Sequence, residues 1–270
     1  MLAISNFWAK YAHSNWILRN LNLRLHSGEF VVIGGKSGSG KTTLARCLVG
    51  LFPSFYDGEV KGEIDILGKN PLVGPRKVFG TVGFVSQRPS DYTVALTVKE
   101  EMLFPLENLG LSKAECFSRI RHFLNLLNVE DLIDRPTTEL SVGELQKVEI
   151  ASALSLRSKI LVLDEPLARL DRISAIDLVK KLKHLVEDGV LVIIFEHHLD
   201  EVLPVADKVF MLDNGQLIKL AAPDDFMLLF EHVDLPEISE TFLTLQKKNL
   251  VDEIPITINR AHEIVEEKIG

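Results

Sequence analysis

A glycine-rich segment, GGKSGSGKTTLARCLVGL, follows the aliphatic run Phe30 to Ile33 and leads into an apolar helical pattern. Glycines let successive backbone N–H groups turn toward one point without Cβ clashes, which makes a nest for an anion. The following helix would add the positive end of its dipole. This strand, loop and helix form the context in which the pattern G-x-x-x-x-G-K-[ST] binds nucleotide phosphates. The segment therefore predicts a nucleoside triphosphate site and a fold built around it.

Two side chains in this segment have specific predicted roles. Lys41 supplies a point charge between the β- and γ-phosphates, and the Thr42 hydroxyl is a ligand for Mg²⁺. The alternative is a glycine-rich turn with chance residues, and the complete strand–loop–helix context favours the phosphate site. The residues predicted to bind the nucleotide here are Gly35, Lys36, Ser37, Gly38, Ser39, Gly40, Lys41, Thr42 and Thr43.

A second aliphatic run, Ile160 to Leu163, ends abruptly in the carboxylates Asp164 and Glu165. Open α/β folds bind their ligands at the carboxyl edge of the sheet, where such residues would lie. Asp164 is suited to the Mg²⁺ shell, and Glu165 is suited to act as general base toward an attacking water. A pair of solvated acids at a strand end is the alternative, and it is weak beside a phosphate loop.

The segment LSVGELQ, from Leu140 to Gln146, reads as the capped start of a helix. Ser141 and Glu144 have the spacing of a capping box. A capped start preceded by a turn also offers a hydroxyl and free N–H groups to a phosphate. The local pattern leaves open whose phosphate that would be.

Short aliphatic runs alternate with helical patterns along much of the chain. Continuous apolar runs suit parallel strands that are covered on both faces, so the sequence predicts an α/β fold with a mainly parallel sheet. Antiparallel strands are expected in a separate part. The predicted parallel strands are Phe30–Ile33, Gly83–Val85, Ile160–Leu163 and Val190–Phe195, and the antiparallel segments are Leu2–Phe7, Trp16–Leu25, Glu63–Leu67 and Val209–Leu220.

Charge and hydropathy exclude several classes of protein. The net charge of −8 and the pI near 5.5 argue against a general nucleic-acid binder, whose domain is usually basic. The first residues lack the apolar core of a signal peptide, and no run reaches the roughly 18 apolar residues of a membrane span. Cys47 and Cys116 are expected to be buried thiols in a reducing compartment.

Taken together, these motifs resemble the nucleotide-binding subunit of ATP-binding cassette (ABC) transporters over about residues 1–220. LSVGE is similar to the signature motif of that family, which binds the γ-phosphate of ATP held by the opposing subunit. The resemblance therefore implies a head-to-tail dimer around two ATP molecules with Mg²⁺, in which Ser141 and Gly143 act in trans. Glu144 of the same motif is a further expected nucleotide-binding residue.

The resemblance assigns further residues. Tyr11 matches the aromatic residue that stacks on adenine, and Gln87 matches the glutamine that reaches Mg²⁺ and the water. His197 matches the switch histidine that contacts the γ-phosphate, and Asp171 matches the loop that contacts the other subunit. Glu165, His197 and Gln87 are thus the expected catalytic residues, and Thr42, Gln87 and Asp164 the expected metal ligands.

Val142 departs from the family pattern, because the signature usually has a glycine there. A β-branched residue could crowd the phosphate or restrict the turn. Reduced turnover, a low-turnover ATP-dependent clamp, or a heterodimer with one weaker site are therefore open alternatives. A homodimer is equally open.

Residues 87–112 resemble the ATPases of energy-coupling-factor importers of vitamins and of cobalt or nickel, in their Q-R-P, T-V and N-L-G-L-S runs. The implied protein is the ATP-hydrolysing motor of a membrane transporter, peripheral to the cytoplasmic face and bound to transmembrane subunits. A soluble ABC ATPase acting on nucleic acid or ribosomes is the alternative, and the acidic charge disfavours it. The expected organisation is an ATPase domain at 1–222, a helical subdomain at about 99–156, and a C-terminal helical appendage at 223–270.

Overall fold

The computed structural model describes residues 1–91, 93–220, 245, 261 and 263–266 of the 270-residue chain. Its central element is a six-stranded sheet with the strand order β5-β6-β7-β3-β8-β9. The first five strands of this order are parallel, and β9 pairs antiparallel with β8. The strands are β3 (Phe30–Gly34), β5 (Val82–Val85), β6 (Ile160–Asp164), β7 (Leu191–Glu196), β8 (Lys208–Asp213) and β9 (Gln216–Leu220).

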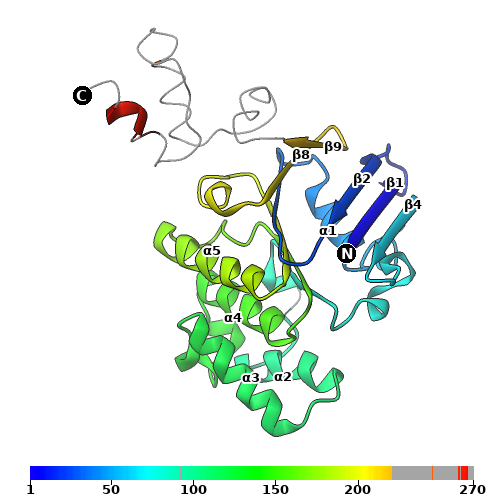
Figure 1. Cartoon of the computed structure of the whole chain (residues 1–270). Coiled ribbons are helices and arrows are strands. Elements are labelled where there is room, and N and C mark those ends of the chain that lie inside the picture. Colours follow the sequence, from blue (N-terminus) through cyan, green and yellow to red (C-terminus); the bar gives the residue numbers. More distant parts are fainter. Residues whose placement is uncertain (92, 221–244, 246–260, 262, 267–270) are drawn as a thin grey trace.

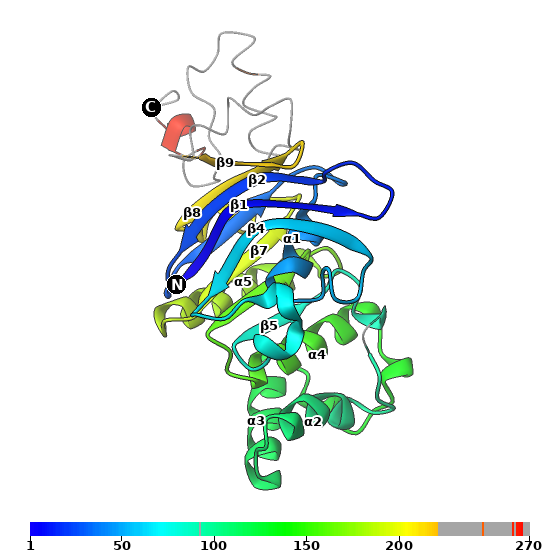
Figure 2. The same cartoon turned by 90° about the vertical axis from the view of Figure 1, so that its right-hand side faces the viewer.

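A second sheet is antiparallel and has the order β2-β1-β4. Its strands are β1 (Leu2–Tyr11), β2 (Leu18–Leu25) and β4 (Gly58–Ile66). Leu2 of β1 pairs with Leu25 of β2 on one side and with Ile66 of β4 on the other. This sheet lies over helix α1, on the face of the central sheet opposite α5 (Figures 1 and 2).

Five α-helices lie within residues 1–220. The helix α1 (Lys41–Leu48) is buried between the two sheets, whereas α2 (Val98–Asn108), α3 (Lys113–Leu126), α4 (Val142–Ser155) and α5 (Arg172–Glu187) lie on the other side (Figure 1). Helices α2, α3 and α4 pack on one another. Short 3₁₀ turns occur at Pro71–Val73, Pro75–Lys77, Pro89–Asp91, Glu130–Leu132, Thr137–Glu139 and Leu203–Val205.

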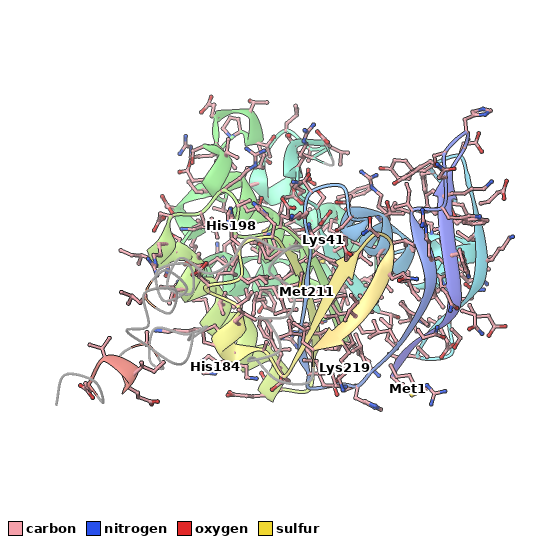
Figure 3. The ribbon with its side chains drawn as sticks, turned by 90° about the horizontal axis from the view of Figure 1, so that it is seen from above. Met1, Lys41, His184, His198, Met211 and Lys219 are labelled. Carbon is pink, nitrogen blue, oxygen red and sulfur yellow. The ribbon has the colours of Figure 1, made fainter. Side chains whose placement is uncertain are left out.

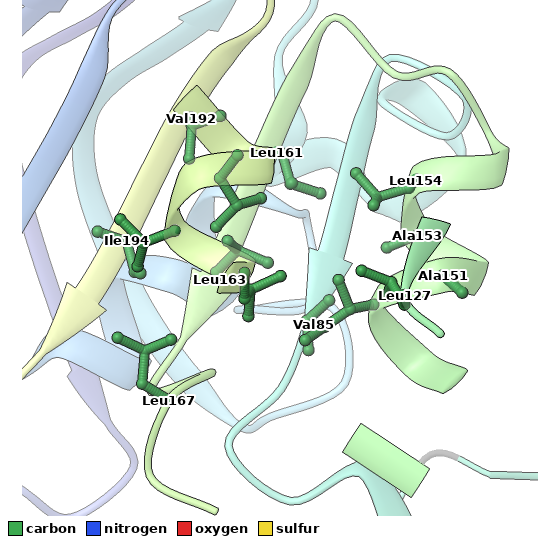
Figure 4. Packing of buried hydrophobic residues seen from close by; sticks show 14 of the residues in the cluster. Val85, Leu127, Ala151, Ala153, Leu154, Leu161, Leu163, Leu167, Val192 and Ile194 are labelled. Carbon is green, nitrogen blue, oxygen red and sulfur yellow. The ribbon is translucent and has the colours of Figure 1, made fainter. Parts of the chain in front are cut away.

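Apolar side chains fill both faces of the central sheet, as its continuous aliphatic strands require. On one face, Leu161, Leu163, Val192 and Ile194 pack toward the helices, where they meet residues of α4 such as Leu154 (Figure 4). On the other face, the strands pack against α1 and the antiparallel sheet. Burial on both faces confirms the predicted α/β fold with a mainly parallel sheet.

One predicted segment was placed in the wrong sheet. Val209–Leu220 was expected in a separate antiparallel part, whereas β8 lies in the central sheet parallel to β3, and only β9 pairs antiparallel with it. Ser112 accepts a hydrogen bond from the backbone N–H of Glu115, but the Glu115 carboxylate pairs with Arg119 rather than completing a capping box. Phe117 of the same helix is exposed. Among the helices of the described residues, none is both long and apolar enough to cross a membrane. The predicted appendage at 223–270 lies almost entirely outside the described residues.

Candidate functional site

The phosphate loop connects β3 to α1, and its backbone needs glycine at two positions. Gly35 has φ of 151°, and a Cβ there would lie 2.5 Å from the carbonyl oxygen of Leu212. Gly40 has φ of 110°, and a Cβ there would press on the side chains of Leu18 and Ile17. By contrast, a Cβ at Gly38 would meet nothing within 4 Å, so this exposed glycine faces open space. The loop therefore has the shape of a cradle for an anion.

Lys41 is the first residue of α1, and its side chain is only 5% exposed. Its ammonium group donates hydrogen bonds to the carbonyl oxygens of Gly35 and Lys36, and it lies 3.9 Å from the Glu165 carboxylate. Burial lowers the pKa of Lys41, and the neighbouring carboxylates oppose that shift. Figure 3 shows Lys41 between the helical part and the antiparallel strands. The charge is thus held inside the loop, where a phosphate would compensate it.

Asp164 ends β6 and is 1% exposed. Neither of its carboxylate oxygens accepts a hydrogen bond within the described part of the chain. Burial raises the pKa of Asp164 to about 6, although the nearby Thr42 hydroxyl favours the charged form. Buried carboxylate oxygens without partners, next to a hydroxyl and the Gln87 amide, are the oxygen ligands that Mg²⁺ prefers. These residues therefore fit the divalent cation.

Glu165 follows Asp164 in a left-handed backbone conformation, with φ of 50°. This conformation is costly for a residue other than glycine and is concentrated at functional sites. The Gln87 amide donates a hydrogen bond to Oε2 of Glu165, and Nδ1 of His197 lies 3.7 Å from Oε1. The structure therefore brings the three residues expected to be catalytic into contact around one carboxylate.

Two adjoining pockets contain most of the expected nucleotide and metal residues. Thr42 and Gln87 line both of them, so the two pockets form one site. One is lined by Ile17, Ser37, Gly38, Gly40, Lys41, Thr42, Thr43, Gln87 and Glu165. The other is lined by Thr42, Arg46, Phe84, Ser86, Gln87, Arg88, Asp91 and Asp164.

Ile17 and Arg46 also line these pockets, and neither belongs to a motif that predicts the site. Arg46 lies four residues after Thr42 in α1, and this spacing puts both on one helix face, so helical periodicity could have found it. Ile17 contacts the loop from the segment before β2, and no local pattern indicates it.

Tyr11 lies outside both pocket linings. Its hydroxyl accepts a hydrogen bond of 3.0 Å from Arg46, and its ring makes edge contacts with Phe52 and Tyr56. The ring is therefore packed at the end of β1 beside the helix that follows the loop. Stacking on adenine stays a prediction for this residue.

The start of α4 has the capping box that was expected. The Ser141 hydroxyl accepts from the Glu144 N–H at 3.3 Å, and the Glu144 carboxylate accepts from the Ser141 N–H at 2.8 Å. The hydrogen bonds to Ser141 lower the pKa of Glu144. None of Ser141, Gly143 and Glu144 lines the phosphate-loop pockets. They are presented elsewhere on the surface.

Val142 is the first residue of α4 and is 52% exposed. Its backbone is not among the positive-φ positions, so the helix begins here without a glycine. Crowding of a bound phosphate or restriction of the turn by Val142 stays a prediction. Gly143 is the next residue of α4, and a Cβ on it would lie 3.3 Å from the Arg169 carbonyl oxygen.

The site has a phosphate loop between a parallel strand and a buried helix, two carboxylates at the end of β6, and a capped helix that begins with the signature motif. These features define an ATP-binding cassette, a class of the P-loop nucleoside triphosphatases. The family model of the ABC transporter matches residues 18–168. The chain belongs to the ABC transporter family, as an ATPase subunit. It is 34% identical over 257 residues to the energy-coupling factor transporter ATP-binding protein EcfA of Methanocaldococcus jannaschii, covering 93% of this chain and 90% of the relative.

Solved structures give the same result. CbiO1 of Clostridium perfringens, part of the ABC transporter complex CbiONQ, superposes with a TM-score of 0.72 at 28% identity, covering 91% of this chain and 96% of CbiO1. A dimeric post-hydrolysis state of the cassette MJ0796 bound to ADP and Pi also superposes with a TM-score of 0.72. Its identity is 27%, covering 82% of this chain and all of that one.

Proposed function

We propose that this chain is the ATP-hydrolysing motor of an energy-coupling-factor-type importer of a vitamin or metal ion, on the cytoplasmic face of the membrane. The observation that carries the proposal is the contact of Gln87 and His197 with the Glu165 carboxylate beside the phosphate loop. The likeness to EcfA and CbiO1 supports the choice of branch. The acidic net charge disfavours the alternative, a soluble ABC ATPase acting on nucleic acid.

In this proposal, the loop N–H groups and Lys41 bind the β- and γ-phosphates of ATP. Glu165 accepts a proton from the attacking water, whose oxygen forms a bond to the γ-phosphorus as the bond to the ADP oxygen breaks. Gln87 and His197 hold the carboxylate and the γ-phosphate in position. Thr42, Asp164 and Gln87 would hold Mg²⁺, which would neutralise negative charge on the phosphates.

The signature residues would complete the site of a second ATPase subunit. Ser141 and Gly143 begin a helix whose free N–H groups and positive dipole end can receive a phosphate, while lying away from the loop of their own chain. A head-to-tail dimer would bring them to the γ-phosphate of the partner. Glu144 stays in the capping box and would act by holding Ser141 in place.

A groove on α2 is suited to the membrane subunits. It is lined by Val94, Ala95, Leu96, Glu100, Leu103, Phe104 and Glu107. Val94, Leu96 and Phe104 are 72%, 79% and 58% exposed. A cluster of exposed large apolar side chains marks an interaction site. The segment that carries Val94 and Leu96 follows Gln87 closely in the chain. We infer that helical segments of the transmembrane subunits occupy this groove, so that their movement reaches Gln87.

The segment that forms one wall of the groove is firmly held. The buried Glu101 carboxylate accepts hydrogen bonds of 2.9 Å from the N–H groups of both Val94 and Ala95. The Thr137 hydroxyl donates to the Ala95 carbonyl oxygen at 2.8 Å. A prearranged apolar wall lowers the entropy cost of docking.

The proposed organisation keeps the ATPase domain at 1–222, the helical subdomain at about 99–156 and the appendage at 223–270. A low-turnover clamp is a second candidate function, and the exposed Val142 in the signature favours it.

Glu165→Gln tests the proposal, with Gln216→Glu on an exposed strand as control. The variant should bind Mg-ATP with unchanged affinity, form a nucleotide-dependent dimer in solution-mass measurements, and lose about 10²- to 10⁴-fold in phosphate release, the scale of general-base catalysis. Unchanged turnover in Glu165→Gln would sink the catalytic assignment. A wild-type protein that binds but hardly hydrolyses ATP would favour the clamp. A protein that binds ATP and stays monomeric would indicate a different ATPase partner.

A further inference from the structure

The strand β7 ends in a buried carboxyl group that none of the proposed roles uses. Glu196, the residue before His197, is 1% exposed. Its Oε1 accepts a hydrogen bond of 3.0 Å from the backbone N–H of Leu167. In the described part of the chain it forms no ion pair within 4 Å. Burying a carboxyl group costs free energy of folding, so a buried carboxyl group at this position indicates a specific role.

The residue that Glu196 holds lies in the turn between two functional elements. This turn runs from Glu165 to Asp171, the N-cap of α5. The Leu167 side chain is buried near the carboxyl ends of β6 and β7 (Figure 4). Two hydrogen bonds join the turn to β7. One links the Glu165 N–H to the Phe195 carbonyl oxygen at 2.9 Å, and the other is the Glu196 bond to Leu167.

The same turn also reaches the signature helix. The Arg169 carbonyl oxygen approaches Gly143 so closely that a Cβ on this glycine would lie 3.3 Å away. The turn is therefore held at β7 by Glu196 at one end and lies against the start of α4 at the other. A shift of Leu167 would displace Glu165 at the γ-phosphate and the helix start that carries Ser141.

We propose that Glu196 is a positioning residue for ATP hydrolysis, which fixes the turn bearing Glu165 against the strand that ends at His197 by accepting the Leu167 N–H. The role needs an acceptor oxygen at this position. Burial, reinforced by the charge of Glu165, raises the pKa of Glu196 to about 8, which favours the uncharged form of the group. The inference rests on the proposed catalytic roles of Glu165 and His197.

Two variants of similar size separate the acceptor from the charge. Glu196→Gln keeps an oxygen that can accept from Leu167 and removes the titratable group. Glu196→Leu removes the acceptor and leaves the Leu167 N–H buried without a partner. Glu149→Gln is the matched control, because it changes a half-buried carboxyl group in α4 away from the turn.

The readouts are kcat and KM for Mg-ATP hydrolysis, thermal unfolding, and Mg-ATP affinity measured in the Glu165→Gln background. Glu196→Gln should keep kcat within about threefold. Glu196→Leu should lose about 10- to 100-fold in kcat, the scale of a small misplacement of a reacting group, with KM and ATP affinity within about threefold. If Glu196→Leu does not fold, Glu196→Met replaces it as the flexible apolar variant.

Wild-type kcat in Glu196→Leu or Glu196→Met would overturn the inference, and so would an equal loss in Glu196→Gln. Failure of the proposed function would give a different result, because the Glu165→Gln variant would then hydrolyse ATP at the wild-type rate.

Discussion

Gln87 and Glu165, which are 78 residues apart in the chain, are joined by a hydrogen bond from the Gln87 amide to the Glu165 carboxylate. One follows β5 and the other follows β6, and these neighbouring parallel strands end at the same edge of the sheet. The bond connects the proposed general base to the segment that leads to the α2 groove. A change at the groove thus has a short physical route to the hydrolytic site.

The first prediction concerns this bond. Gln87→Glu replaces the donor with an acceptor of the same shape and brings two carboxylates into contact. Repulsion should displace Glu165, so kcat should fall by about 10- to 100-fold while the protein remains folded. Steady-state ATPase assays and thermal unfolding measure both. Gln216→Glu makes the same change on exposed β9 and should leave kcat unaltered. Equal kcat in Gln87→Glu and wild type would show that the bond has no part in hydrolysis.

The second prediction separates two roles of Tyr11. Its hydroxyl binds Arg46, and its ring is the one expected to stack on adenine. Tyr11→Phe should cost about 1 kcal/mol of stability through the lost hydrogen bond and leave ATP affinity within about threefold. Tyr11→Ala should in addition weaken ATP binding by about 1–3 kcal/mol, the usual worth of base stacking.

Calorimetric titration with ATP and with inorganic tripolyphosphate measures this difference. The loss in Tyr11→Ala should appear with ATP and be absent with tripolyphosphate. If both ligands weaken equally, Tyr11 supports the phosphate loop through Arg46, and the stacking assignment is wrong.

The third prediction concerns pH. Burial, and the nearby charge of Glu101, raises the pKa of Glu149 from 4.5 to about 7, and only the Thr93 hydroxyl, at 3.3 Å, opposes the shift. Between these two values the folded protein binds more protons than the unfolded chain. The contribution to stability is therefore complete below pH 4.5 and is lost as the pH rises to about 7.

Glu149→Gln should remove this dependence. Its free energy of unfolding should fall by roughly 2–3 kcal/mol less than that of wild type between pH 5 and pH 8, which is about 5 °C in Tm. Thermal unfolding at several pH values provides the measurement. Glu63→Gln, at an exposed position on β4, should follow the wild-type curve. A Glu149→Gln curve parallel to wild type would contradict the assignment.

Local patterns predicted much of the site. The phosphate loop, the carboxylates Asp164 and Glu165, and the capping box at Ser141 depend on neighbours within a few residues, so the sequence identifies them directly. The parallel sheet also follows from continuous aliphatic runs, because such runs need cover on both faces.

What could not be predicted depends on contacts between distant segments. The bond of Glu196 to Leu167 requires β6 and β7 to be neighbours in a particular register, and nothing near either residue specifies that. Ile17 reaches the loop only because the antiparallel sheet lies over α1. The packing of Tyr11 against Phe52 and Tyr56 is likewise a tertiary contact.

The last prediction tests whether the signature acts in trans. Lys41→Ala should abolish phosphate binding at the loop of its own chain, and Ser141→Ala should disable the signature. If each site combines the loop of one subunit with the signature of the other, a mixed dimer contains one intact site and one doubly altered site. Random mixing makes half of the dimers mixed, and half of their sites are intact, so the activity should recover to about a quarter of wild type.

Each variant alone should be nearly inactive, so the recovered activity is measured against a low background. Mixing either variant with the double variant is the control, because those mixtures contain no intact site. If the signature served the loop of its own chain, every site in the mixture would carry one altered element and no activity would return. A mixture that dimerises with ATP, as its solution mass would show, and remains inactive would therefore contradict the trans arrangement.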